Sequence, residues 1–373
     1  MAILLSDPDI SLEELEAVSE ALKSPCLEAG PRVEAFEAAF AQALGRRHGV
    51  AVASATLGLM LALKSLGIGP QDEVIAAPFS LRETVHGIAL AGARPVFADV
   101  DYWSGTLALG SAAAAITPRT RAIVAGNTNG HPAAWQALKA LADRHSLLLI
   151  EDSSEAIGSR YQGRPVGSFG DLAIFDLTQP GPLSAGTGAI VVTDDASLAG
   201  KLRRLRGRPG VIDGLSYCAQ MSELQAALGR VQLKRLSQIL ARRKQVEADY
   251  LAHIQSFEGI KPPYVAPEAD EVHWMVYLVH LGTRFSRSSR DAILHDLATA
   301  GIEAAPFSHP WHLHPAYAEL GYRRGALKMA EKLADRAIAL PFHGHLREDQ
   351  VGFIVQALKD AAVNVGAGAA IYL

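Results

Sequence analysis

The chain has 373 residues, of which 49% are hydrophobic, so it is long enough to form one large core and a smaller second one. Its 35 basic and 39 acidic residues nearly balance, and the most basic stretch, Lys201 to Gly210, is short, which argues against a nucleic-acid-binding protein. Cys26 and Cys218 are too few for a disulfide framework or a zinc site. Acidic residues from Asp7 onward argue against a signal peptide, and no apolar run reaches the roughly 18 to 20 residues of a membrane span. We therefore expect a cytoplasmic protein that does not enter a membrane.

Short β-branched segments alternate with longer amphipathic segments in the first half of the chain. Residues 33–45 (VEAFEAAFAQALG) predict a helix that ends at a glycine, and residues 49–56 (GVAVASAT) predict a strand. The alternation continues through helices at 57–69, 81–92 and 133–145 and strands at 72–78, 94–100, 121–126 and 146–152. This order predicts an α/β fold with a mostly parallel sheet.

The second half has a different pattern. Residues 222–254 predict one long helix with its charges on one side, which would connect two domains. A strand is expected at 273–281, and helices are expected at 289–301 and 348–361. We therefore expect a large domain over residues 1–245 and a smaller C-terminal α/β domain over residues 246–373. The Gly- and Ala-rich tail, NVGAGAAIYL, supports no prediction.

Two segments place polar side chains at strand ends. In VASATLG, backbone N–H groups at the start of a helix, with Thr56 as an extra donor, would favour a phosphate, although an ordinary helix cap explains the same residues. Asp152 ends a buried strand, where open α/β sheets place ligand-contacting residues. A carboxylate there would hold a protonated ring nitrogen, or else cap the next helix.

Three histidines lie close together among aromatic residues in FSHPWHLHPAY, at His309, His312 and His314. This spacing is compatible with a metal site. Because no cysteine or convergent carboxylate accompanies them, we interpret these histidines as packed or substrate-facing and expect no metal.

Taken together and in order, several segments resemble the DegT/StrS-type sugar aminotransferases, a branch of the fold-type-I enzymes that use pyridoxal phosphate (PLP). The similar segments cover almost the whole chain and include SPCLEAGPRVEAFEAAFAQALG, ASATLGLMLALKSLGIGPQDEVIAAPFS, IEDSSEAIGSRYQGRPVGSFGD, MSELQAALGRVQLKRL and LPFHGHL. The resemblance implies an aspartate-aminotransferase-like fold with a large domain and a smaller C-terminal domain. It also implies a homodimer whose sites are completed by the partner chain, and a sugar-nucleotide ligand.

The resemblance also assigns cofactor-binding positions. It implies that Asp152 holds the PLP ring nitrogen and that Ser54, Ala55 and Thr56 form the phosphate-binding turn, with Ala55 replacing a glycine. Ser80 and Leu81 follow the strand predicted at 72–78 and belong to the same set. Leu81 stands where the family has an aromatic residue that stacks on the cofactor ring. Glu155, in the IEDSSE segment, completes the expected cofactor-binding set.

Other departures from the family fall on the same pocket. The Schiff-base lysine of the family aligns with Gln179 in IFDLTQPG, and a phosphate-contacting serine aligns with Ile174. A carboxamide is neither basic nor usefully nucleophilic, so Gln179 cannot form the covalent link or move the proton that transamination requires. Ile174 offers a phosphate no hydrogen bond and adds a desolvation cost. The sequence therefore predicts that standard lysine-dependent transamination does not occur.

Three functional hypotheses remain open from the sequence. The first is a homologue of nucleotide-sugar aminotransferases, of amino-sugar or polysaccharide biosynthesis lineage, that binds PLP or pyridoxamine phosphate (PMP) non-covalently. The second is a binding or regulatory pseudoenzyme that has kept the fold and the dimer and lost the cofactor. The third is an enzyme that uses Asp152, Glu155 and His312 as acid and base in the old cavity.

Overall fold

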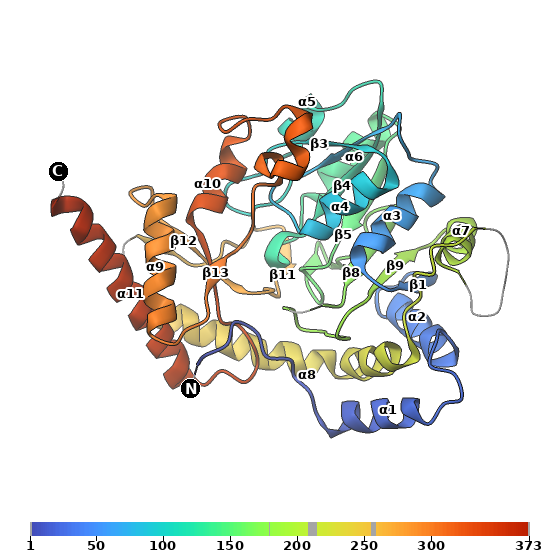
Figure 1. Ribbon diagram of the computed structural model, residues 1–373, viewed down its shortest axis with the longest axis horizontal. Helices are drawn as coiled ribbons and strands as arrows, with labels where there is room; N and C mark the ends of the chain where they lie inside the picture. The colour runs from blue at the N-terminus through green and yellow to red at the C-terminus, as the bar shows by residue number, and fades with distance from the viewer. Residues whose placement is uncertain (1, 179, 208–214, 255–258, 372–373) are drawn as a thin grey trace.

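A seven-stranded sheet forms the centre of the larger part of the protein, in a computed structural model that describes residues 2–178, 180–207, 215–254 and 259–371 (Figure 1). Strand β9 runs antiparallel to both its neighbours, and the other pairs in the sheet are parallel. The prediction of a mostly parallel α/β sheet is thus confirmed. In spatial order the strands are β1 (His48–Val52), β9 (Ala189–Thr193), β8 (Leu172–Asp176), β5 (Leu148–Asp152), β4 (Thr120–Gly126), β2 (Glu73–Ala76) and β3 (Arg94–Phe97).

Helices cover both faces of this sheet because its strands are apolar on both sides, as expected for buried parallel strands. One face packs against α3 (Ala55–Ser65), α4 (Arg82–Ala91) and α7 (Ala196–Arg206). The other face packs against α2 (Pro31–Ala43), α5 (Leu109–Ala114), α6 (Trp135–Arg144) and the N-terminal part of α8 (Glu223–Ile254). Helix α1 (Leu12–Leu22) lies outside these layers along α8 (Figure 1).

A second, four-stranded antiparallel sheet forms the smaller part of the protein. Its strands, in spatial order, are β10 (Ile260–Lys261), β12 (Tyr277–Leu281), β14 (Ala337–Leu340) and β13 (Ala305–Pro306). Helices α9 (Arg287–Thr299) and α11 (Glu348–Ile371) pack on it. A third sheet contains the short strands β11 (Ala269–Glu271), β6 (Arg160–Tyr161) and β7 (Arg164–Pro165).

The long helix α8 matches the predicted helix closely and passes without a break through residues 245 and 246, where a domain boundary is predicted. Its packing partners change along its length. Ala226 belongs to the core beneath the large sheet, whereas Val246, Tyr250 and Ile254 belong to the core of the small sheet. The helix therefore connects the two cores as one continuous rod.

Several predicted elements differ in length from the structure. The strand predicted at 49–56 ends at Val52, where the chain leads into α3, and the strand predicted at 94–100 ends at Phe97. The predicted strand at 273–281 is paired only from Tyr277 to Leu281, because the carbonyls of Trp274 and Met275 accept hydrogen bonds from the buried Arg243 at 2.9 and 2.7 Å instead of from a neighbouring strand. The final helix continues well beyond residue 361, to Ile371.

The chain returns to the large sheet after β13. This segment contains η2 (Trp311–Leu313), η3 (Pro315–Leu320) and α10 (Lys328–Arg336), and the 3-10 turn η1 (Thr128–Gly130) lies on the large sheet itself. Tyr317, Leu327 and Leu333 pack in the same core as β2 and β4. Residues of the predicted small domain therefore close over the strand ends of the large one.

Candidate functional site

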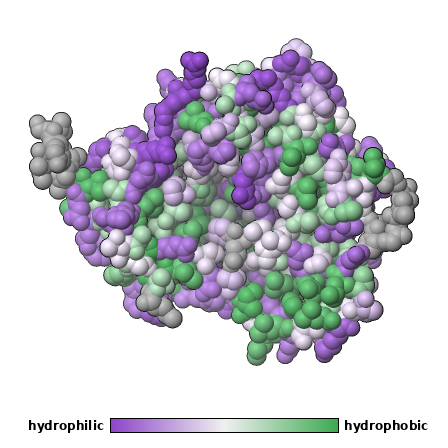
Figure 2. All heavy atoms as spheres, in the orientation of Figure 1, coloured by the Kyte–Doolittle hydropathy of each residue, from purple (hydrophilic) through white to green (hydrophobic). Residues whose placement is uncertain are grey.

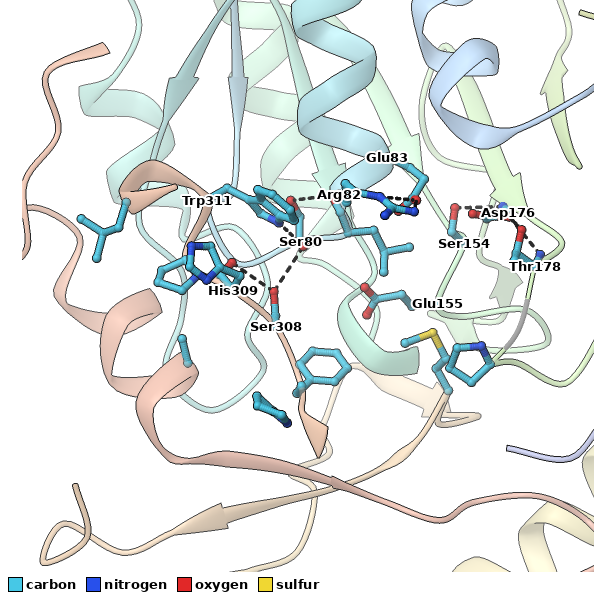
Figure 3. A pocket seen from close by; sticks show the side chains of 18 of the residues that line it. Ser80, Arg82, Glu83, Ser154, Glu155, Asp176, Thr178, Ser308, His309 and Trp311 are labelled. Atoms are coloured by element: carbon cyan, nitrogen blue, oxygen red, sulfur yellow. Dashed lines mark hydrogen bonds and ion pairs between the residues drawn. The ribbon is translucent and has the colours of Figure 1, made fainter. Parts of the chain in front are cut away.

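A cavity of about 930 Å³ lies at the carboxyl ends of β1, β2, β5 and β8. Open α/β sheets bind their ligands at this edge because loops from several parallel strands meet there. Its opposite wall comes from α9, from the loop after β13 and from α10. Figure 3 shows the side chains from both walls facing the same space.

The start of α3 forms one corner of the cavity. Ser54 is its N-cap, in an extended conformation, and the Ser54 Oγ accepts a hydrogen bond from the Leu57 N–H at 3.3 Å. Ser54 and Thr56 line the cavity, whereas Ala55 is buried in the core. Unpaired N–H groups and the helix dipole make this corner favourable for an anion.

Ile174 does not lie on the cavity wall. It is buried beneath α3, so close that a Cβ atom added to Gly58 would lie 2.9 Å from the Ile174 Cδ1. The residue therefore fills the space under the first turns of α3 with an apolar side chain, as its β-branched shape and its inward position on β8 require.

Asp152 ends β5, as predicted, but lies behind the cavity wall. One carboxylate oxygen accepts a hydrogen bond from the Thr84 hydroxyl, and the other accepts one from the Ser154 N–H at 3.2 Å. Burial, the larger influence, raises the pKa of Asp152 above its usual range, and the two hydrogen bonds oppose this rise. Both of its oxygens already have partners.

Glu155 points from the loop after β5 into the cavity (Figure 3). It is only 6% exposed, and its Oε2 accepts a hydrogen bond from the Asn129 N–H. Burial raises the pKa of Glu155 to about 8, and the nearby Asp152 and Glu83 add to that rise. This raised pKa favours the protonated form of the side chain near neutral pH.

Three further carboxylates line the cavity and were not predicted, namely Glu83, Asp176 and, on the opposite wall, Asp335. Asp176 ends β8, and its Oδ1 accepts hydrogen bonds from the Thr178 N–H at 2.9 Å and the Thr178 hydroxyl at 2.6 Å. Glu83 lies in the first turn of α4 and pairs with Arg82 at 2.9 Å. Burial raises the pKa of Asp176, with smaller contributions from Glu83 and Asp152. Asp176 ends a strand, as Asp152 does, but its turn with Thr178 makes it look like an ordinary loop aspartate in the sequence.

Ser80 and Leu81 line the cavity between these groups. The Ser80 Oγ donates to the Ala77 carbonyl at 3.0 Å, and the Ser80 carbonyl accepts from the Trp311 Nε1 at 2.9 Å. Leu81 occupies the N-cap position of α4. This strand end is thus tied directly to the segment that returns from the small sheet.

The loop after β8 contributes Thr178 and Pro180 to the cavity wall. Gln179 lies between them, outside the described residues. Within the described part of the chain, no lysine lines the cavity, and its basic groups are arginines and one histidine: Arg82, Arg287, Arg290, Arg324 and His309.

His312 is not brought to the cavity. It is 1% exposed, packs against the rings of Phe97 and Tyr322, and its Nε2 lies 3.1 Å from Glu331. This placement corrects the expectation that His312 acts as a catalytic acid or base, because an aromatic core surrounds the ring. His309 lines the cavity instead (Figure 3).

Away from the cavity, Asp7, His343 and His345 are brought close enough to share one ion, and in the described part of the chain this is the one such group. None of them lines the cavity. Among the described helices, none combines the length and the apolar character that a membrane span needs.

Comparisons with known proteins agree with this geometry. Residues 8–359 match the model of the DegT/DnrJ/EryC1/StrS aminotransferase family. The chain is 34% identical to the GDP-perosamine synthase of Caulobacter vibrioides, over 97% of this chain and 98% of that protein. The solved structure of Streptomyces venezuelae DesV with a ketimine intermediate has a TM-score of 0.87, with 34% identity over 94% of each chain. The Streptococcus pneumoniae sugar aminotransferase Spr1654, in its PMP form, has a TM-score of 0.93 and 25% identity over 99% of this chain and all of that one. The chain therefore belongs to the DegT/DnrJ/EryC1/StrS aminotransferase family.

Proposed function

We propose that this protein is a homodimeric member of the sugar-aminotransferase family that binds a sugar nucleotide and does not perform lysine-dependent transamination. The observation that carries the proposal is the composition of the cavity. Its described lining holds no lysine, and it includes the carboxylates of Glu83, Glu155 and Asp176. The residue there is Gln179, which offers no nucleophile for a covalent link to a cofactor.

The residues of the cavity fit PLP or PMP only as a non-covalent ligand. The N–H groups at the start of α3, with Ser54 and Thr56, suit a phosphate, whereas Asp152, the carboxylate expected to hold a protonated ring nitrogen, lies behind the cavity wall. Leu81 provides an apolar surface without an aromatic ring. When bound, PMP would supply the amino group that sugar aminotransferases transfer. Both oxygens of Asp152 already accept hydrogen bonds, from Thr84 and Ser154, so neither is free to pair with the ring nitrogen of the cofactor.

The arginines of the cavity support a nucleotide-linked ligand. Arg287 and Arg290 come from the start of α9, and Arg324 comes from the segment before α10. Guanidinium groups recognise phosphates through paired hydrogen bonds. Arg290 already donates to Asp291 and Arg324 to Asp335, whereas Arg287 lies 3.9 Å from its nearest carboxylate, so Arg287 is the arginine of this wall that best suits the diphosphate of a sugar nucleotide.

The alternative function is a binding or regulatory pseudoenzyme. It is favoured by Glu83, Glu155 and Asp176, because the described lining of the cavity offers these carboxylates and no lysine. An acid–base enzyme would rely on Glu155, whose pKa of about 8 suits a proton donor near neutral pH.

A titration with PLP and PMP tests the proposal, using the wild type, Gln179→Lys and the matched control Gln179→Met. We expect saturable binding in calorimetry, and after borohydride reduction we expect mass spectrometry to find no covalent adduct in any of the three. The added lysine would follow Asp176 by three positions in a segment whose Thr178 and Pro180 line the cavity, and a nearby carboxylate raises the pKa of an amine, so we expect this amine to stay protonated at pH 7.5. An adduct trapped on the new lysine of Gln179→Lys would contradict this account of the pocket, and an adduct in the wild type would overturn the proposal.

An apolar surface on α1 supports the dimer. Figure 2 shows apolar side chains gathered over α1 and its surroundings, and the side chains of Leu12, Leu15 and Leu22 there are 74%, 59% and 58% exposed. Exposed leucines in such a group mark an interaction site. We expect sedimentation equilibrium to give twice the chain mass, and the variant Leu12→Glu/Leu15→Glu to weaken self-association at least tenfold. The control Leu90→Glu changes an exposed leucine on α4 and should remain dimeric. A monomeric wild type would exclude the dimer.

A further inference from the structure

A cluster of one carboxylate and two imidazoles lies away from the cavity, where the segment before α1 meets the loop between β14 and α11. Asp7 belongs to the segment, and His343 and His345 belong to the loop. One possible ligand atom of each residue lies within 4.8 Å of those of the other two. The His345 Nδ1 lies 2.9 Å from the Asp7 Oδ2, although these residues are 338 positions apart in the chain. The fold therefore brings together three groups of the kinds that bind transition metals.

His343 is buried without a partner for its polar atoms. It is only 7% exposed, and neither of its ring nitrogens makes a hydrogen bond with a described residue. A neutral imidazole has one donor and one acceptor nitrogen, and leaving both unpaired in the interior costs free energy. The Leu4 carbonyl approaches the ring without completing a hydrogen bond. If one ring nitrogen bound an ion, the other would donate to such a carbonyl, as metal-binding histidines usually do.

The separations within the cluster suit a small ion. When each ligand atom lies about 2.0 to 2.2 Å from a tetrahedral ion, the ligand atoms lie about 3.4 Å from one another. The Asp7–His345 distance is shorter than this, and no separation in the cluster exceeds 4.8 Å. The side chains of Asp7 and His345 are 43% and 44% exposed, so their rotation would complete the site without moving the core. The same exposure leaves a fourth position open to water.

The charges around the cluster limit the affinity that it can reach. Arg242 and Arg243 belong to α8, which packs against this loop. The Arg242 Nε would lie 3.7 Å from a Cβ atom added to Gly344, and Arg243 donates to a carbonyl of the same loop at 2.9 Å. Arg242 is paired with Asp9, which leaves Asp7 as the carboxylate that faces the two histidines. A divalent ion would be attracted by Asp7 and repelled by the two arginines, so we expect micromolar affinity.

We propose that Asp7, His343 and His345 bind a divalent transition-metal ion of the zinc type, and that this ion fastens the segment before α1 to the small-sheet part of the protein. Two imidazoles and one carboxylate are typical zinc ligands, whereas Mg²⁺ and Ca²⁺ prefer oxygen ligands throughout. The site is separate from the cavity and does not depend on the function of the cavity.

Backbone hydrogen bonds already place this segment beside the small sheet. The Glu303 N–H donates to the Ile3 carbonyl at 2.9 Å, and the Phe342 N–H donates to the Leu5 carbonyl at 3.1 Å. An ion bound through Asp7 would add a link next to these bonds. Opening of the segment would then require loss of the ion, so the two amides report on ion binding.

Titration calorimetry with Zn²⁺ alone, on protein without a histidine tag, tests the metal site. We expect one site per chain, and no measurable binding of Mg²⁺ at the same concentrations. Asp7→Asn and His345→Gln should each weaken Zn²⁺ binding at least tenfold, and both change half-exposed side chains, so the fold is kept. His343→Gln should weaken it as strongly by removing the buried ligand. The control His145→Gln changes an exposed histidine at the end of α6 and should keep the wild-type affinity.

Amide hydrogen exchange tests the fastening of the segment. Zn²⁺ should slow exchange at Glu303 and Phe342 in the wild type and in His145→Gln, and it should leave exchange unchanged in His345→Gln. No saturable Zn²⁺ binding below about 100 μM would overturn the metal site. Equal binding by the wild type and His345→Gln would also overturn it, because the ion would then be adventitious. Binding without slower exchange at the two amides would overturn the fastening role.

Discussion

Replacing Glu155 by Gln is expected to stabilise the folded protein by about 3 to 5 kcal/mol at pH 8.5 and by less than about 1 kcal/mol at pH 5. Burial raises the pKa of this carboxyl from 4.5 to about 8 in the folded protein. Above pH 8 the folded protein must hold a buried negative charge, and the amide of Gln removes it. The amide oxygen can still accept the hydrogen bond from the Asn129 N–H.

The direction of this effect follows from proton binding. Between pH 4.5 and about 8 the unfolded chain has released the Glu155 proton while the folded protein retains it, so the free energy of unfolding falls as pH rises through this window. Glu83, Asp152 and Asp176 face the same region. The pKa values of Asp152 and Asp176 are also raised, mainly by burial. The free energy of unfolding of Glu155→Gln will therefore still depend on pH, although less than that of the wild type.

Urea unfolding of the wild type and Glu155→Gln at pH 5, 7 and 8.5 measures the difference. Glu13→Gln is the matched control, because Glu13 is 52% exposed and its pair with Lys234 is screened by solvent. A stabilisation that does not change with pH would mean that the Glu155 carboxyl is not protonated in the folded protein.

Part of the site could be predicted from the sequence because strand order and strand ends can be read from apolar runs. Asp152 and Ser54 follow such runs directly, and both lie at the predicted edge of the sheet. Asp176 also follows a strand, but it forms a turn with Thr178, and an aspartate in a turn is too common to indicate a site. Glu83 resembles an ordinary acidic residue in the first turn of a helix.

The position of His312 could not be predicted from the sequence. Histidines beside Trp and Pro in a loop give no sign of which side chain faces the ligand, and burial in the core around Phe97 decides it. The continuity of α8 past residue 245 could be predicted from its helical pattern, but its change of packing partner could not. That change depends on where the small sheet folds back, which the local sequence does not encode.

Replacing Glu151 by Gln is expected to destabilise the protein by about 3 kcal/mol, because this carboxylate holds the loops behind the cavity together. Glu151 is fully buried on β5, next to Asp152. Its Oε1 accepts from the Asn127 Nδ2 at 3.0 Å and the Ser153 Oγ at 2.9 Å, and its Oε2 accepts from the Phe169 N–H at 3.0 Å. The Gln amide would point its NH2 group at donors in either orientation, leaving buried N–H groups without an acceptor.

Urea unfolding at pH 7 measures this loss, and amide hydrogen exchange locates it. Exchange should speed up most at Gly167, Phe169 and Gly170, whose N–H groups all donate to Glu151. The control Glu13→Gln makes the same chemical change on the surface and should lie within about 1 kcal/mol of the wild type. Unchanged exchange at those three amides in Glu151→Gln would show that the loop has other support. In that case Asp152 and Glu155, which follow Glu151 on the same segment, would owe their positions to the strand alone.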